Sequence, residues 1–111
     1  MALTLWHNPR CSKSRETLAL LQARGHSPEI RLYLTDAPSR TELEAVISKL
    51  GQSADTLVRW KDAKGLIERD ADHDTILATL AENPKLIERP ILITGQSARL
   101  GRPPEQVLEI L

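Results

Sequence analysis

Residues 3–34 read LTLWHNPRCSKSRETLALLQARGHSPEIRLYL. Alternating apolar side chains at residues 3–5 predict a short strand, which the Asn8-Pro9 pair ends. A helix is predicted over residues 12–25, and renewed alternation over residues 30–34 predicts a second strand. Two neighbouring strands joined through a helix run parallel. This stretch therefore predicts an α/β fold built on a parallel strand pair.

The predicted first helix has a polar start and a glycine end. Ser12 is its candidate N-cap, and Gly25 suits the position just after the last turn. The apolar side chains expected to face the core are Leu18, Leu20 and Leu21.

The middle of the chain favours helices. A capping-box pattern at Ser39-Arg40-Thr41-Glu42, followed by apolar residues at helical spacing, predicts a helix over residues 39–51. A short helix capped by a serine is predicted over residues 53–58, and another around residues 76–80. Between them, residues 61–74 carry eight charged side chains and are expected to form an exposed connection.

The C-terminal part predicts a hairpin and a final helix. Residues 91–94 read ILIT, which is typical of a strand buried on both faces, and a tight turn leads to an antiparallel partner over residues 98–101. Pro103 or Pro104 suits the first turn of a last helix. Its expected inward side chains are Val107, Leu108, Ile110 and Leu111. The whole pattern predicts one α/β domain, residues 1–111, with a mixed four-stranded sheet and helices on both faces.

Composition narrows the functional classes. The 111 residues include 15 basic and 15 acidic side chains, so the formal net charge is zero and a general polyanion binder is disfavoured. Only 3% of the residues are aromatic, which argues against a stacking platform for single-stranded nucleic acid.

The sequence also bears on the compartment. No apolar run is long enough for a membrane span, and the N-terminal residues lack the basic and apolar regions of a signal peptide. One cysteine excludes an intrachain disulfide. A free thiol without an export signal fits a cytoplasmic protein.

Cys11 is the sharpest chemical feature, because it lies between a predicted strand and a predicted helix. Unpaired N–H groups and the dipole at a helix N-terminus stabilise a thiolate. Lys13 and Arg15 would add positive potential. The alternative is a buried, inert cysteine, because free cysteines are often buried.

His7 lies four residues before Cys11 and could pair with the thiolate or shape its pKa. The alternative is a histidine at the strand end that hydrogen-bonds to a neighbour. No spacing of His, Cys and Asp resembles a metal site, so no metal ion is expected.

Three arginines form a second candidate constellation: Arg59, Arg89 and Arg102. Each lies at the boundary of a predicted element, and these boundaries could converge on the loop of Cys11. Guanidinium groups bind tetrahedral oxyanions in a bidentate manner. Taken singly, each arginine is better explained by a surface salt bridge, and the sequence alone does not show that the three converge. Pro90 follows Arg89 and suits the first residue of a strand, and a cis bond there would turn backbone groups toward the cysteine.

Five segments together resemble a known family: HNPRCSKSR at residues 7–15, LYL at 32–34, LVR at 57–59, LIERPI at 86–91 and RLGRPPE at 99–105. They are similar to the arsenate reductases of the thioredoxin-like superfamily that are coupled to glutathione and glutaredoxin. The resemblance implies a thioredoxin-like fold with a helical insertion.

The resemblance also implies roles for individual residues. Cys11 matches the family nucleophile. The oxyanion-binding arginines would be Arg59, Arg89 and Arg102. The supporting positions would be His7, Ser14, Arg15 and Pro90, with Pro90 in the cis form. Cys11 would attack arsenate, glutathione would act as co-substrate, glutaredoxin would recycle the mixed species, and no cofactor would be bound.

Two other functions remain open. A glutathione-dependent thiol or mixed-disulfide reductase would need Cys11 but not three converging arginines. A redox regulator resembling the Spx proteins, which bind RNA polymerase, is the second alternative. Such sensors often use a Cys-x-x-Cys pair, whereas Ser14 occupies the fourth position here, which favours the enzyme.

Overall fold

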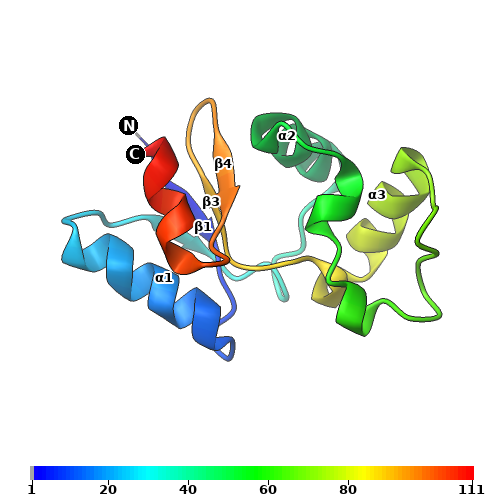
Figure 1. Ribbon diagram of the computed structural model, residues 1–111, viewed down its shortest axis with the longest axis horizontal. Coiled ribbons are helices and arrows are strands. Elements are labelled where there is room, and N and C mark those ends of the chain that lie inside the picture. Colours follow the sequence, from blue (N-terminus) through cyan, green and yellow to red (C-terminus); the bar gives the residue numbers. More distant parts are fainter. Residues whose placement is uncertain (1) are drawn as a thin grey trace. The chain divides into compact units, whose positions relative to one another are not determined.

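The computed structural model describes residues 2–111, which form two compact units. The first unit comprises the described residues up to Asp36 together with Arg89–Leu111, and the second comprises Ala37–Glu88. Figure 1 shows the chain, with the α-helices and the strands β1, β3 and β4 labelled. That the chain is one domain stays a prediction.

The first unit is built on a mixed four-stranded sheet. Its strands are β1 (Thr4–Trp6), β2 (Glu29–Arg31), β3 (Ile91–Ile93) and β4 (Ala98–Leu100). The order is β2-β1-β3-β4, with β1 and β2 parallel and the other two pairs antiparallel. The predicted mixed sheet is confirmed. β1 has the predicted length but lies one residue later, and the other three strands are shorter than their sequence patterns suggested.

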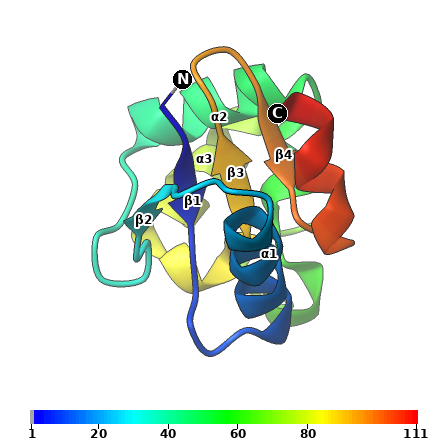
Figure 2. The ribbon, with the colours of Figure 1, turned by 90° about the vertical axis from the view of Figure 1, so that its left-hand side faces the viewer.

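Two helices lie on one face of this sheet, as Figure 2 shows: α1 (Ser12–Ala23) and the 3₁₀ helix η4 (Pro104–Ile110). They enclose a core of four fully buried aliphatic side chains: Leu5, Leu21, Leu92 and Val107. Leu18 and Ile110 pack against this core, as expected. Leu111, predicted to face inward, is 41% exposed because it lies beyond the end of η4.

The second predicted strand ends earlier than its alternation indicated. The backbone turns at Leu32, whose carbonyl oxygen accepts hydrogen bonds from the N–H groups of Thr35 and Asp36. Tyr33 is fully buried, whereas Leu32 and Leu34 are more than 40% exposed. The alternation therefore failed in two respects: its apolar residues Ile30, Leu32 and Leu34 are the exposed ones, and the strand itself ends at Arg31.

The second unit is helical and corresponds to the predicted insertion. Its elements are α2 (Arg40–Leu50), η1 (Ala54–Leu57), η2 (Trp60–Asp62), α3 (His73–Glu82) and η3 (Pro84–Leu86). Ser39 and Glu42 form the predicted capping box. Gly51 ends α2 at a φ of 69°, a left-handed conformation that favours glycine.

The charged stretch of residues 61–74 is largely exposed, with two exceptions that the sequence analysis missed. Ala63 and Ile67 are buried, and the Ala63 carbonyl oxygen accepts hydrogen bonds from the N–H groups of Leu66 and Ile67. Two buried apolar side chains therefore hold this segment against the rest of its unit, and the segment is not fully exposed to solvent.

The start of α1 differs from the prediction. Cys11 is its N-cap residue, Ser12 is the first helical residue, and no side chain makes a cap hydrogen bond there. The backbone N–H groups of the first turn are therefore left free to act on Cys11, which a serine cap would have occupied.

These two helix starts give a paired test of stability. Ser39→Ala should lower the free energy of unfolding by about 1 kcal/mol, because it removes a cap hydrogen bond from the Glu42 N–H. Ser12→Ala should leave it within about 0.5 kcal/mol of the wild type, as for exposed sites without such a bond. Urea denaturation measures both, and equal losses would contradict the assignment of Cys11 as the N-cap.

Candidate active site

Cys11 is held at the start of α1 by a tightly bonded loop. Its backbone N–H donates to the Asn8 carbonyl oxygen at 3.0 Å, and the Arg10 N–H donates to Asn8 Oδ1 at 3.0 Å. The Asn8 N–H in turn donates to the hydroxyl of Ser14, which is fully buried. Asn8 thus organises the loop, a role that the sequence analysis missed although an Asn-Pro turn signals it.

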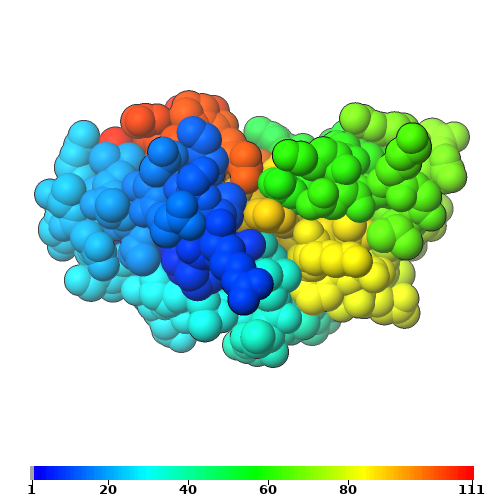
Figure 3. Space-filling model, turned by 90° about the horizontal axis from the view of Figure 1, so that it is seen from below, coloured from blue at the N-terminus to red at the C-terminus, as the bar shows by residue number. Residues whose placement is uncertain are grey.

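This loop is accessible at the protein surface. Pro9 and Arg10 are exposed, and the Cys11 side chain is half-buried. Figure 3 shows the loop and the first turn of α1, in dark blue, at the surface of the first unit. Cys11 is therefore not the inert core cysteine of the alternative interpretation.

The sheet register brings two arginines to the same end of the sheet as Cys11. In the antiparallel pairing of β3 and β4, Ile91 lies opposite Leu100. One residue further on, the Gly101 N–H donates to the Pro90 carbonyl oxygen at 2.9 Å. The following pair is Arg89 and Arg102, where Arg102 Nε donates to the Arg89 carbonyl oxygen at 2.7 Å.

Both guanidinium groups reach the thiol. Arg102 Nη2 lies 3.5 Å from Cys11 Sγ, and the Arg89 side chain hydrogen-bonds to the same sulfur. The predicted convergence of Arg89 and Arg102 on Cys11 is confirmed. The Arg89–Pro90 bond is cis, as predicted, and so is Arg102–Pro103.

The pKa of Cys11 is lowered by the sum of opposing effects. Burial alone raises it, because the charged thiolate loses water. Hydrogen bonds from the Ser14 N–H, the Arg89 side chain and the Lys13 N–H outweigh burial, and the positive charge of Arg89 adds to them. The site therefore favours a thiolate, the nucleophilic form of cysteine.

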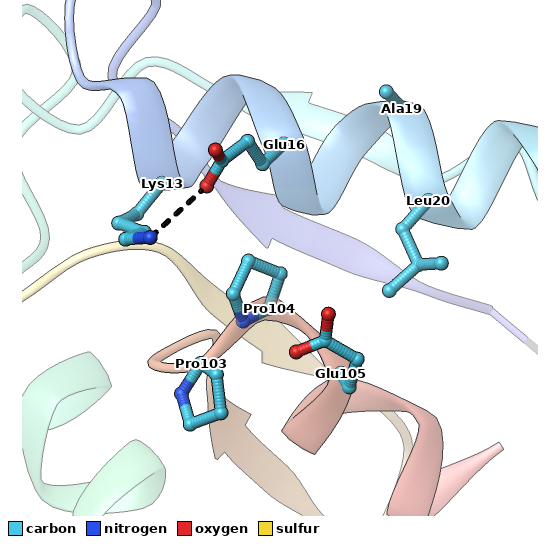
Figure 4. Close-up of a pocket in the computed structure, with 7 residues that line it drawn as sticks. All are labelled: Lys13, Glu16, Ala19, Leu20, Pro103, Pro104 and Glu105. Atoms are coloured by element: carbon cyan, nitrogen blue, oxygen red, sulfur yellow. Dashed lines mark ion pairs between the residues drawn. The ribbon is translucent and has the colours of Figure 1, made fainter.

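Lys13 acts differently from its expected role. Its ammonium group lies 3.3 Å from Glu16 Oε2, in a pocket of about 620 Å³ between α1 and the start of η4 (Figure 4). The lysine assists Cys11 through its backbone N–H. The difference arises because the residue type does not determine the direction in which a side chain of the first helical turn points.

Arg15 supports the loop rather than the sulfur. Its Nη1 donates to the Pro9 carbonyl oxygen at 2.9 Å. Arg15 also faces His7, whose pKa is lowered first by burial and then by this positive charge. His7 Nδ1 is buried without a hydrogen-bond partner among the described residues. A neutral His7 cannot form an ion pair with the thiolate. Its Nδ1 is also not hydrogen-bonded to a neighbouring residue.

Arg59 belongs to the second unit, where two carboxylates hold its side chain. Its Nε lies 2.7 Å from Asp62 Oδ2, and its Nη1 lies 3.5 Å from Glu88 Oε1. Its backbone N–H donates to the Leu86 carbonyl oxygen at 2.7 Å. The convergence of Arg59 on Cys11 stays a prediction.

The described part of the chain lacks two kinds of feature. Within residues 2–111, no group of three or more His, Cys, Asp or Glu side chains is placed to hold a metal ion. None of the helices in that range combines the length and apolar character needed to cross a membrane.

These features define a class of protein: a thioredoxin-like α/β protein whose single thiol lies at a helix N-terminus beneath two arginines. The profile of the ArsC family matches residues 6–110, and the chain belongs to this family. An arsenate reductase of Haemophilus influenzae is 45% identical over the full length of both chains. One of Neisseria meningitidis serogroup B is 40% identical, over 98% of this chain and 97% of its own.

The architecture agrees with a solved relative. The structure of an arsenate reductase from Vibrio cholerae superposes with a TM-score of 0.91, at 45% sequence identity, covering 100% of this chain and 98% of its own. The thioredoxin-like fold expected from the sequence is confirmed.

The electrostatics of Cys11 can be measured by its alkylation. The pH midpoint of the reaction with iodoacetamide should lie below that of an unperturbed thiol. Arg89→Gln should raise this midpoint by about one unit, a tenfold loss of thiolate, because it removes a charge and a hydrogen bond. The control is Arg99→Gln, since Arg99 pairs with Glu109 at 3.1 Å. Equal midpoints in the two variants would contradict the geometry described above.

Proposed function

We propose that this protein reduces arsenate to arsenite, with Cys11 as the nucleophile and glutathione and glutaredoxin as the source of electrons. One observation carries the proposal: two guanidinium groups surround a thiol whose pKa is lowered. A tetrahedral oxyanion fits such paired forks, and its arsenic atom would then lie within reach of the sulfur.

The arginines have two tasks in this reaction. Before the reaction, Arg89 and Arg102 stabilise the thiolate. During the attack they stabilise the negative charge on the arsenate oxygens, where fixed donors lower the barrier most. Arg59 is proposed as the third oxyanion ligand, on the strength of the family resemblance.

In the proposed reaction, the thiols supply the two electrons that arsenic gains. Cys11 Sγ forms a bond to pentavalent arsenic, and one oxygen leaves as water after protonation. Glutathione attacks the adduct, and two thiols become a disulfide as arsenic gains two electrons. Arsenite leaves, and glutaredoxin reduces the resulting mixed disulfide.

The remaining proposed residues support this site. Ser14 and Arg15 fix the loop of Cys11 through the Asn8 N–H and the Pro9 carbonyl oxygen. Pro90 continues the ladder that aligns the two arginines, and His7 is buried at the end of β1. A reducing cytoplasm, where the thiol stays free, is the proposed location, and no bound cofactor is required.

The decisive assay is multiple-turnover formation of arsenite. The wild type should sustain it only with glutathione and glutaredoxin present, and Cys11→Ser should abolish it, because a hydroxyl supplies almost no anion near neutral pH. Arg102→Ala should lower kcat/KM for arsenate by about 100-fold, the usual effect of removing one charge-stabilising donor.

A second substrate distinguishes arsenate reduction from the alternative activity, the reduction of mixed disulfides. If the protein is a general mixed-disulfide reductase, it should reduce a glutathionylated peptide. Arg102→Ala should lower that rate by far less than about 100-fold, because it removes a contact with the thiolate but no contact with an oxyanion. Arsenite formation without any added thiol, or activity retained in Cys11→Ser, would refute the proposed mechanism. Arg99→Gln serves again as the control for the loss of an arginine.

A further inference from the structure

Gly101 lies where three segments of the first unit approach closely. A Cβ atom added at this position would lie 2.5 Å from Thr17 Oγ1 of α1 and 2.7 Å from Pro90 Cγ. Both distances are shorter than van der Waals contact allows, and Gly101 itself is buried. No other glycine of this chain has an atom within 4 Å of such a Cβ.

The constraint at Gly101 is space rather than backbone conformation. Positive φ angles occur at Gly25, Gly51 and Gly65, and Gly101 is not among them. Any residue could adopt its backbone angles, but only glycine fits between Thr17 and Pro90. Thr17 and Ser14 are fully buried on the same face of α1, so this face cannot withdraw without moving the first turn.

Gly101 is covalently joined to Arg102, and its N–H donates to Pro90. A side chain at Gly101 would push this segment away from Pro90 and from α1. The shift would lengthen the bond from Arg102 Nε to the Arg89 carbonyl oxygen and the contact of Arg102 Nη2 with Cys11 Sγ, now 2.7 and 3.5 Å.

We infer that Gly101 is a positioning residue of the active site: its missing side chain lets the segment of Arg102 close against Pro90 and Thr17, so that the guanidinium reaches Cys11. The reactive role of Cys11 is part of the proposed function, and the inference rests on it. The charged groups in contact with the sulfur are Arg89, just before β3, and Arg102, which follows Gly101 after the end of β4.

The test compares one glycine with another. Gly101→Ala adds a methyl group at the crowded position. Gly95→Ala, in the turn between β3 and β4, adds the same group where nothing lies within 4 Å and φ is not positive. Circular dichroism and thermal denaturation establish that each variant folds.

Two measurements report how the arginines act on Cys11 and on a bound anion, and neither requires catalytic turnover. The pH dependence of Cys11 alkylation by iodoacetamide reports the thiolate, and protection from alkylation by sulfate reports oxyanion binding. Gly101→Ala should raise the alkylation midpoint by about one unit and weaken sulfate protection about tenfold. Gly95→Ala should match the wild type in both. A folded Gly101→Ala variant that also matches the wild type would overturn the inference.

A milder variant covers the case in which Gly101→Ala does not fold. Thr17→Val replaces the Oγ1 that faces Gly101 with a larger methyl group, and it should shift both readouts in the same direction by a smaller amount. Wild-type values for Thr17→Val in that case would overturn the inference. Because Thr17 Oγ1 is the closest contact, its removal should relieve part of the crowding. Both readouts of the double variant Gly101→Ala with Thr17→Ala should therefore lie between those of the wild type and those of Gly101→Ala.

The outcomes for this residue and for the proposed function are separable. If the wild type fails to form arsenite but Gly101→Ala still raises the alkylation midpoint, the proposed function fails and the positioning role stands. If the wild type forms arsenite and Gly101→Ala leaves both readouts unchanged, the positioning role fails and the function stands.

Discussion

The hydrogen bond from the Arg102 guanidinium to the Arg89 carbonyl oxygen, at 2.7 Å, is the interaction on which the site depends. It extends the β3–β4 ladder by a side-chain bond where the strands themselves have ended. One guanidinium edge is thereby fixed to the backbone, and Nη2 remains directed at Cys11. A charge anchored to the sheet does not need to reorganise when an anion arrives, which is the condition for strong electrostatic stabilisation.

The thiolate is stabilised by two kinds of donor. The backbone N–H groups of Ser14 and Lys13 are available because α1 begins at Cys11 without a side-chain cap. The guanidinium groups belong to Arg89 and Arg102, which flank β3 and β4. Burial destabilises the charged thiolate, so the effect of either set of donors on the pKa of Cys11 has to be weighed together with burial. The half-buried position of Cys11 leaves the sulfur accessible while keeping the donors close.

Patterns of local sequence predicted much of this architecture. Alternation indicated the strands, the capping box located α2, and Arg89 and Arg102 were placed at the boundaries of predicted elements. Local patterns could not give the direction of a long side chain. The Lys13 side chain was expected to add positive potential near Cys11, but it pairs with Glu16. Local patterns also could not reveal the crowding at Gly101, which arises from Thr17 and Pro90, far from it in sequence.

The count of thiols connects this geometry to a partner. Reduction of a pentavalent oxyanion by two electrons converts two thiols to a disulfide, and the chain contains one cysteine. Ser14, at the position where a second cysteine would complete a Cys-x-x-Cys pair, is fully buried and accepts a hydrogen bond from the Asn8 N–H. Its hydroxyl thus supports the loop of Cys11, and in the proposed reaction the second thiol comes from another molecule. The exposed loop at Pro9 and Arg10 leaves an approach to Cys11 for that molecule.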